Sequence, residues 1–279
     1  MVVQAPAPYS SSQARPQARA RRKPVMYRPR PQPLSVDPAH RRALPHWPGG
    51  WALLLALSGL GLSPSLGAQT PPSPSERSAY TGLLAAADQG DLPTLTRLLS
   101  TTAPPATLAH RDGLGRTAVH LAAHAGHHAA LRQLAHAGAD LNALDHEAYD
   151  AVTIAAVAND EATLALLLQL GASAQQITSP YRGTALIAAA HLGHAGVVRQ
   201  LIAAGAPLDH VNRLHWTATI EAVVLGDGGP RHQATLAALV QAGARLDLTD
   251  REDRTPLQLA RSRGYTEMVR LLESATTPR

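Results

Sequence analysis

The sequence predicts an all-α fold in which short helix pairs stack into a solenoid, preceded by a disordered leader. Gly-Ala recurs at intervals of 33, 34 and 38 residues, at positions 138, 171, 205 and 243. Regular periods of roughly 20 to 50 residues are typical of repeat proteins. The chain has no Phe and only 3% aromatic residues. Its core must therefore consist of Leu, Ala, Val and Ile, which favours close-packed helices over a sheet sandwich.

The first 68 residues predict an export leader. Residues 1–47 carry one lysine and eight arginines against one acid, a net charge of +8. An uncharged apolar run follows at residues 51–62, and Ser65, Gly67 and Ala68 supply a cleavage region. This is the layout of a secretory signal peptide, and the run is shorter than the roughly 20 apolar residues of a membrane span. We expect a chain without stable membrane insertion once the signal is cleaved.

The sequence of the leader allows alternative interpretations of its apolar run, its export signal and its start. The alternative for the apolar run is an uncleaved anchor or a buried helix. Arg41 and Arg42 provide the arginine pair of a twin-arginine signal without the rest of that pattern. Met26 offers a second start, which would make residues 1–25 an artefact of gene calling. Residues 69–79 are rich in Pro and Ser and predict a linker without a folded segment.

Composition excludes several classes of function. From residue 69 onward there are 16 arginines, no lysine and 19 acidic residues, a net charge of −3. The basic balance therefore belongs to the leader, and we do not expect nucleic acid as a partner. The absence of cysteine excludes disulfides, thiolate metal sites and a Cys nucleophile. No nucleophile elbow or phosphate-binding loop is present, so we expect no enzymatic activity and no cofactor.

Each Gly-Ala pair follows a periodic apolar helix, and a shorter helix precedes that one. The i, i+3, i+4 spacing marks one helix face, formed in turn by Leu131, Leu134 and Ala135; Leu164, Leu167 and Leu168; Val198, Leu201 and Ile202; Leu236, Leu239 and Val240. The glycine that follows suits a left-handed helix end. The shorter helices open with a residue that can cap the first turn, namely Thr117, Asp150, Thr184, Thr217 and Thr255.

These units resemble the ankyrin repeat, whose period is about 33 residues and whose signature is T-P-L-H-x-A. Residues 112–127, Asp-Gly-Leu-Gly-Arg-Thr-Ala-Val-His-Leu-Ala-Ala-His-Ala-Gly-His, are a near-complete copy of its first half. The resemblance covers about 190 of the 279 residues. It implies an ankyrin domain at residues 80–279, with an N-terminal cap unit at 80–111 and five full repeats at 112–144, 145–177, 178–211, 212–249 and 250–273. Residues 226–232 lengthen the turn between the two helices of the fourth full repeat.

The resemblance, which extends to exported ankyrin-repeat proteins of proteobacteria, implies a scaffold and no catalyst. Such arrays generally present their turn tips and first helices, along one concave side, to a protein partner. We expect a monomeric, periplasmic scaffold that binds another protein. One alternative is a secreted or anchored protein that acts on host or neighbouring-cell proteins. Another is a metal-binding accessory protein that uses the His-rich first repeat.

Candidate partner-binding residues lie in the tips of the third and fourth full repeats: Tyr181, Arg182, Arg213 and His215. Tyr and Arg are the residue types that anchor protein interfaces, and a Tyr in a turn tip has no core to fill. The alternative is that Tyr181 packs on a neighbouring tip and stiffens it. Trp216 is expected to support the tip from its base.

Two further groups of residues could form a metal site or a reactive carboxylate. His120 and His124 have the i, i+4 spacing of a shared metal site. Because His120 stands where ankyrin repeats use His structurally, we expect no metal. Glu221 replaces an apolar residue in a first helix, and we expect it to be partly exposed on the concave face. A perturbed carboxylate facing the groove is the alternative.

Overall fold

The computed structural model describes residues 71–100 and 105–276, which lie within one compact unit. The predicted leader, its apolar run, its cleavage region and the second start lie outside these residues. Regular structure in the described part is α-helical, apart from one isolated bridge between Thr178 and Gly183. The predicted all-α solenoid is therefore confirmed.

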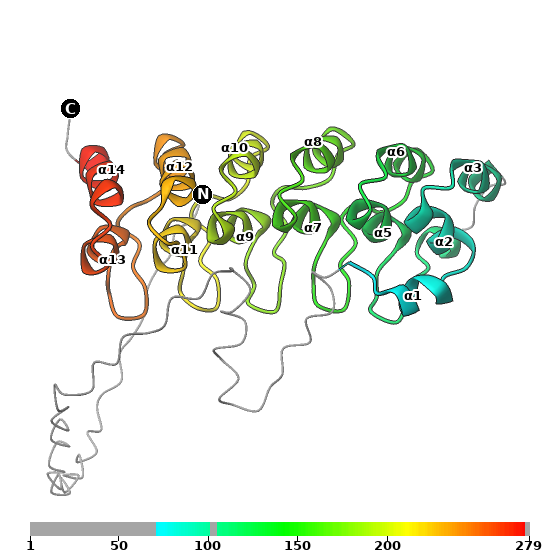
Figure 1. Cartoon of the computed structure of the whole chain (residues 1–279), viewed down its shortest axis with the longest axis horizontal. Coiled ribbons are helices and arrows are strands. Elements are labelled where there is room, and N and C mark those ends of the chain that lie inside the picture. The colour runs from blue at the N-terminus through cyan, green and yellow to red at the C-terminus, as the bar shows by residue number, and fades with distance from the viewer. Residues whose placement is uncertain (1–70, 101–104, 277–279) are drawn as a thin grey trace, which may run out of the picture. The chain divides into compact units, whose positions relative to one another are not determined.

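The helices form two parallel rows (Figure 1). The first row holds the first helix of each unit: α2 (Gly82–Gln89), α5 (Ala118–His124), α7 (Ala151–Val157), α9 (Ala185–Leu192), α11 (Ala218–Val224) and α13 (Pro256–Ser262). The second row holds α3 (Leu92–Ser100), α6 (His128–His136), α8 (Glu161–Gln169), α10 (Ala195–Ala203), α12 (Pro230–Gln241) and α14 (Thr266–Thr276). A short helix, α4 (Pro105–Leu108), lies at the end of the cap unit, before the first full repeat. The turn tips project from the first row, on the side away from the second row.

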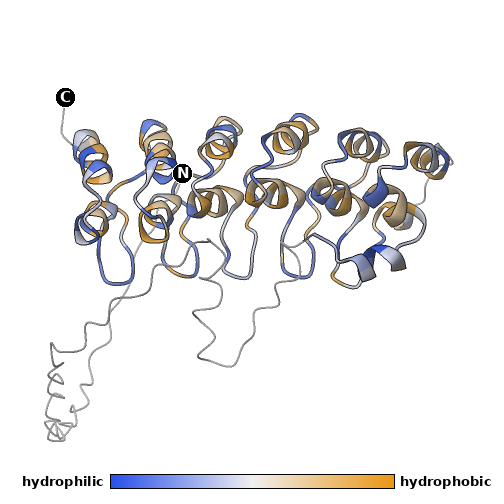
Figure 2. Ribbon diagram, viewed as in Figure 1, coloured by the Kyte–Doolittle hydropathy of each residue, from blue (hydrophilic) through white to orange (hydrophobic). Residues whose placement is uncertain are grey.

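The core lies between the rows and between neighbouring repeats. Leucine and valine side chains of the second row are fully buried at the predicted positions, including Leu131, Leu164, Val198, Leu201 and Leu236. Burial of each such side chain stabilises the fold by about 1.5–3 kcal/mol. Figure 2 shows hydrophobic residues where the helices meet and hydrophilic residues along the tips. The predicted helix register is confirmed.

Capping sets the start and end of the helices as predicted. Asp150, Thr184, Thr217 and Thr255 each accept a hydrogen bond from the backbone N–H three residues later. These bonds satisfy donors that have no partner within the helix. The glycines after the second-row helices have positive φ angles between 79° and 97°, at Gly138, Gly171, Gly205 and Gly243.

The turn between α11 and α12 is longer than its counterparts, as predicted, and spans residues 225–229. Asp227 Oδ1 accepts from the Gly229 N–H at 2.8 Å and lies 2.9 Å from His232 Nδ1. Gly228 has a φ of 70°, and a Cβ there would lie 2.5 Å from the Tyr265 ring. Only glycine fits this close approach.

Residues 74–79 correct the sequence interpretation, which took 69–79 as a linker without a folded segment. They form helix α1 (Pro74–Ala79), which begins with a capping box between Ser73 and Glu76. The motif Ser-Pro-Ser-Glu places Pro at the first helical position, where its missing N–H costs nothing. The Pro and Ser content that suggested a linker is in fact a helix start.

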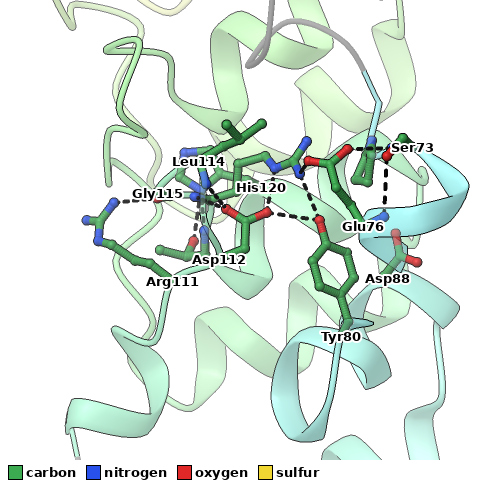
Figure 3. A network of polar contacts seen from close by, with 12 residues as sticks. Ser73, Glu76, Tyr80, Asp88, Arg111, Asp112, Leu114, Gly115 and His120 are labelled. Atoms are coloured by element: carbon green, nitrogen blue, oxygen red, sulfur yellow. Dashed lines mark hydrogen bonds and ion pairs between the residues drawn. The ribbon is translucent and has the colours of Figure 1, made fainter. Parts of the chain in front are cut away.

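Helix α1 is attached to the first full repeat by an ion pair between Glu76 and Arg116 (Figure 3). Glu76 Oε1 lies 2.5 Å from Nη2 of Arg116, whose side chain is completely buried. Arg116 also bonds Asp112 at 2.7 Å and the Tyr80 hydroxyl at 2.8 Å. Since a buried charge is costly unless it is paired, α1 belongs to the folded domain. No helix among the described residues combines the length and apolar character needed to cross a membrane.

Candidate protein-binding surface

Four of the five turn tips are closed by the same side-chain motif. In each, the first residue is Asp or Asn, and its Oδ1 accepts from the backbone N–H groups two and four residues later at 2.9–3.0 Å. These residues are Asp112, Asp145, Asn212 and Asp250. Asp and Asn favour such turns because their short side chains bond their own backbone. The tips are therefore fixed locally.

The third tip is one residue longer and is closed differently. Thr178 pairs through its backbone with Gly183, and the Gly183 N–H donates to Ser179 Oγ at 3.3 Å. Ser179 and Arg182 adopt positive φ angles of 67° and 54°. Such angles are uncommon for residues other than glycine. Tyr181 lies in this tip, immediately before Arg182.

Backbone hydrogen bonds also join neighbouring tips. The His146 N–H donates to Leu114 O at 3.0 Å, that of Ser179 to Ala148 O at 2.8 Å, and that of Arg213 to Tyr181 O at 2.8 Å. The first four tips are thus connected in series. A partner that binds across them meets a surface whose backbone is already ordered, which lowers the entropic cost of binding.

The predicted binding residues come together at the third and fourth tips. Tyr181 is partly exposed, and Arg182, Arg213 and His215 are exposed. Besides the Arg213 N–H bond to Tyr181 O, Arg213 Nη1 lies 3.4 Å from Pro180 O. Trp216 packs against the core below the tip, as expected. The binding role of the four residues stays a prediction.

Two apolar residues at these tips were not predicted. Ile177 is 42% exposed and Val211 is 43% exposed, and they are the exposed large hydrophobic residues of the described part of the chain. Each immediately precedes the first residue of its tip. The residue that precedes the first tip is Arg111. An arginine at this aligned position is the signal in the sequence that residues 177 and 211 are exposed. We define the tip surface as Ile177, Tyr181, Arg182, Val211, Arg213 and His215.

Glu221 lies below the fourth tip, where the expectation of partial exposure is wrong. Its side chain is buried in α11, which packs against α9, and the residue is only 4% exposed. Asn212 Nδ2 donates to Glu221 Oε1 at 3.0 Å. The other carboxylate oxygen has no hydrogen bond within the described residues and lies 3.8 Å from His191 Nδ1.

Burial controls the protonation of both groups in this pair. It raises the pKa of Glu221 to about 7, and the bond from Asn212 only partly offsets this rise. Burial also lowers the pKa of His191, with the nearby His232 and His194 acting in the same direction. Burial thus favours the neutral form of both side chains.

His120 has a structural environment. Its Nδ1 accepts from the Thr117 N–H at 3.1 Å, and its Nε2 lies 3.1 Å from Tyr149 O. Burial lowers its pKa to about 4, so it is neutral at physiological pH. His124 lies one turn later in α5 and is partly buried. Over residues 71–100 and 105–276, no group of three or more His, Cys, Asp or Glu side chains is placed to hold a metal ion.

Comparison with known proteins agrees with the repeat architecture. A family model that describes ankyrin repeats in three copies matches residues 83–178 and again residues 153–250. A second model, which describes ankyrin repeats in many copies, matches residues 230–273. The chain is 34% identical over 193 residues to the ankyrin repeat protein YahD of Escherichia coli K12. The matched region covers 69% of this chain and 94% of YahD.

Solved structures give the same result. An ankyrin repeat domain from Acinetobacter baumannii AYE matches with a TM-score of 0.65 and 40% identity, over 69% of this chain and 96% of that domain. The ankyrin repeat domain of Bcl-3, a member of the IkappaB protein family, matches with a TM-score of 0.64 and 27% identity, over 72% of this chain and 88% of that domain. The chain belongs to the ankyrin-repeat family.

Proposed function

We propose that this chain is a non-catalytic scaffold that binds another protein through the tip surface. Ankyrin repeats are generally protein–protein interaction modules. The observation that carries the placement is the exposure of Ile177 and Val211 on adjacent tips, beside Tyr181 and Arg213. An apolar centre with Tyr and Arg around it is the composition of an interface hot spot.

The proposal includes export to the periplasm. It is supported by the basic segment, the apolar run and the small residues that end at Ala68. A cut after Gly67 or Ala68 leaves the whole of α1, which begins at Pro74. Intact mass and N-terminal sequencing of the chain from a periplasmic fraction test this. We expect a start at Ala68 or Gln69, and a mass that includes residues 51–62 would contradict cleavage.

The binding surface is tested by capture with matched variants. The full chain with a C-terminal tag is expressed in its native cell, cross-linked and purified, and the co-purifying proteins are quantified. We expect the double variant Tyr181→Ala, Arg213→Ala to recover roughly tenfold less partner, the effect of losing a hot spot. Arg199→Ala is the control, because Arg199 is exposed on α10 in the second row.

The unfolding midpoint separates the two roles of Tyr181. If the double variant keeps the midpoint of the parent and loses the partner, Tyr181 and Arg213 act in binding. Full retention of every captured protein would contradict the placement. A lowered midpoint would instead favour the alternative in which Tyr181 stiffens the tips.

A further inference from the structure

The tips of the third and fourth repeats carry positive charge that the protein does not neutralise, and Arg251 of the fifth tip lies beside the exposed Glu252 and Asp253. Arg182, Arg213 and Arg251 are exposed, and none forms an ion pair with a carboxylate of the described residues. Residues 177–220 contain one acid, Asp209, which accepts a bond from the Arg245 N–H at 2.8 Å. The folded part as a whole has a net charge of −3. The basic character is therefore local to these tips.

Neutral contacts hold two of these arginines across the boundary between tips. Arg213 Nη1 lies 3.4 Å from Pro180 O, and Arg251 Nη2 donates to Arg213 O at 2.5 Å. Each guanidinium has five N–H donors, and a single carbonyl acceptor leaves most of them for a ligand. A carbonyl orients the side chain without cancelling its charge.

We propose that the tip surface, together with Arg251 of the fifth tip, binds an acidic protein segment in which Asp or Glu recurs at every third position with apolar side chains between. This inference rests on the proposed function. Carboxylates match the planar donor pair of arginine and form strong charge-assisted hydrogen bonds with it. The exposed Ile177 and Val211, which precede the third and fourth tips, match apolar side chains of the same segment.

Repeat geometry indicates the spacing of the acidic residues. Arg213 and Arg251 each lie four residues before the capping threonine of their repeat, at Thr217 and Thr255, so they occupy equivalent positions. Neighbouring helices pack about 8–10 Å apart, and a segment in the polyproline II conformation has three residues per turn and rises about 3.1 Å per residue. Carboxylates three residues apart in such a segment lie on one side, about 9 Å apart, and therefore reach successive tips.

A phosphate backbone is the other anionic ligand that arginines bind, but the surroundings favour a protein. Nucleic-acid sites generally carry a broad basic patch. Here the same tips also carry two exposed aliphatic side chains, Ile177 and Val211, which a phosphate backbone has no group to cover. An oligonucleotide therefore serves as a competing probe in the test.

The test measures fluorescence anisotropy of labelled 12-residue peptides with the full chain. One peptide has Glu at every third position with Leu and Ser between, and the second has Gln in place of Glu. A 12-nucleotide oligothymidine is the third probe. At about 50 mM salt we expect the Glu peptide to bind roughly tenfold more tightly than the Gln peptide. We expect most of this advantage to disappear at about 500 mM, because salt screens exposed charges.

Variants assign this advantage to the tips. The double variant Arg213→Ala, Arg251→Ala should reduce binding of the Glu peptide to the level of the Gln peptide, whereas Arg132→Ala, Arg199→Ala, on α6 and α10, should not. The basic leader is common to all variants, so only differences between them count. Equal behaviour of the two peptides, including no binding of either, overturns the proposal. So does oligothymidine binding that exceeds peptide binding and depends on the same arginines.

Partner capture separates this inference from the proposed function. If capture is lost with Val211→Ser but is insensitive to salt and to the arginine variant, the tip surface binds a partner that is not acidic. If capture is insensitive to all tip variants, the proposed function itself fails.

Discussion

Glu221→Gln should make the protein more stable above neutral pH. In the folded protein burial raises the pKa of Glu221 from 4.5 to about 7. Because the folded state holds this proton more tightly than the unfolded state, the stability that it contributes is complete below pH 4.5 and is lost as the pH rises through about 7. A shift of this size corresponds to about 3 kcal/mol. Gln keeps the acceptor for Asn212 Nδ2 and carries no charge.

The assay is chemical denaturation of the parent and the variant at intervals from pH 5 to pH 8.5. We expect the free energy of unfolding of Glu221→Gln to gain on the parent with rising pH, by about 3 kcal/mol over the full range. Glu161→Gln, at an exposed glutamate of α8, is the matched control and should stay within about 0.5 kcal/mol of the parent. A Glu221→Gln difference that is the same at pH 5 and pH 8.5 would refute the reasoning.

Three further predictions concern the fold. Leu201→Ala in α10 removes a fully buried side chain and should destabilise by about 2–5 kcal/mol in a denaturant titration; a loss under about 0.5 kcal/mol would mean that the helix register is wrong. Glu76→Ala leaves the buried Arg116 with one partner fewer and should cost about 1–2 kcal/mol, whereas Ser78→Ala on the exposed side of α1 should not lower the melting temperature. Asn212→Asp places a second carboxylate against Glu221 and should destabilise by about 1–3 kcal/mol at pH 8 and by less at pH 5, where a proton is available to the pair.

Local patterns were sufficient to predict the repeated part of the fold. The apolar spacing around Leu201 and the capping role of Thr217 depend on residues within one helical turn, so the sequence contains all the information. Helix α1 was missed for the opposite reason. Its capping box is visible in the sequence, but its stability depends on Arg116, about 40 residues downstream.

The binding surface could be predicted only in part. Tyr181 stands out because a Tyr in a turn tip is unexpected in a chain so poor in aromatic residues, and Arg213 because Tyr and Arg are the residue types that anchor protein interfaces. Ile177 and Val211 resemble core residues, and only the structure shows that they are 42% and 43% exposed within its described part. The burial of Glu221 could not be predicted from its own helix, since it is covered by α9.

The buried Glu221 is explained by Asn212, the first residue of the fourth tip, which donates to it. In the first and fifth full repeats the tip begins with Asp, and an arginine four residues later neutralises its second oxygen, as in the pair of Asp250 and Arg254. In the second full repeat that later residue is Tyr149, and Asp145 Oδ2 has no hydrogen-bond partner among the residues that the structure describes.

Burial raises the pKa of Asp145, which shows the cost of a tip carboxylate without a cation. In the fourth repeat the same position is Trp216, which packs on the core below the tip. An Asp at position 212 would therefore be unpaired as well. Asn212 closes the turn without a charge, but its amide then needs a buried acceptor, and Glu221 supplies it. Trp216, Asn212 and Glu221 thus depend on one another. A substitution of any of the three should alter the tip surface through Asn212.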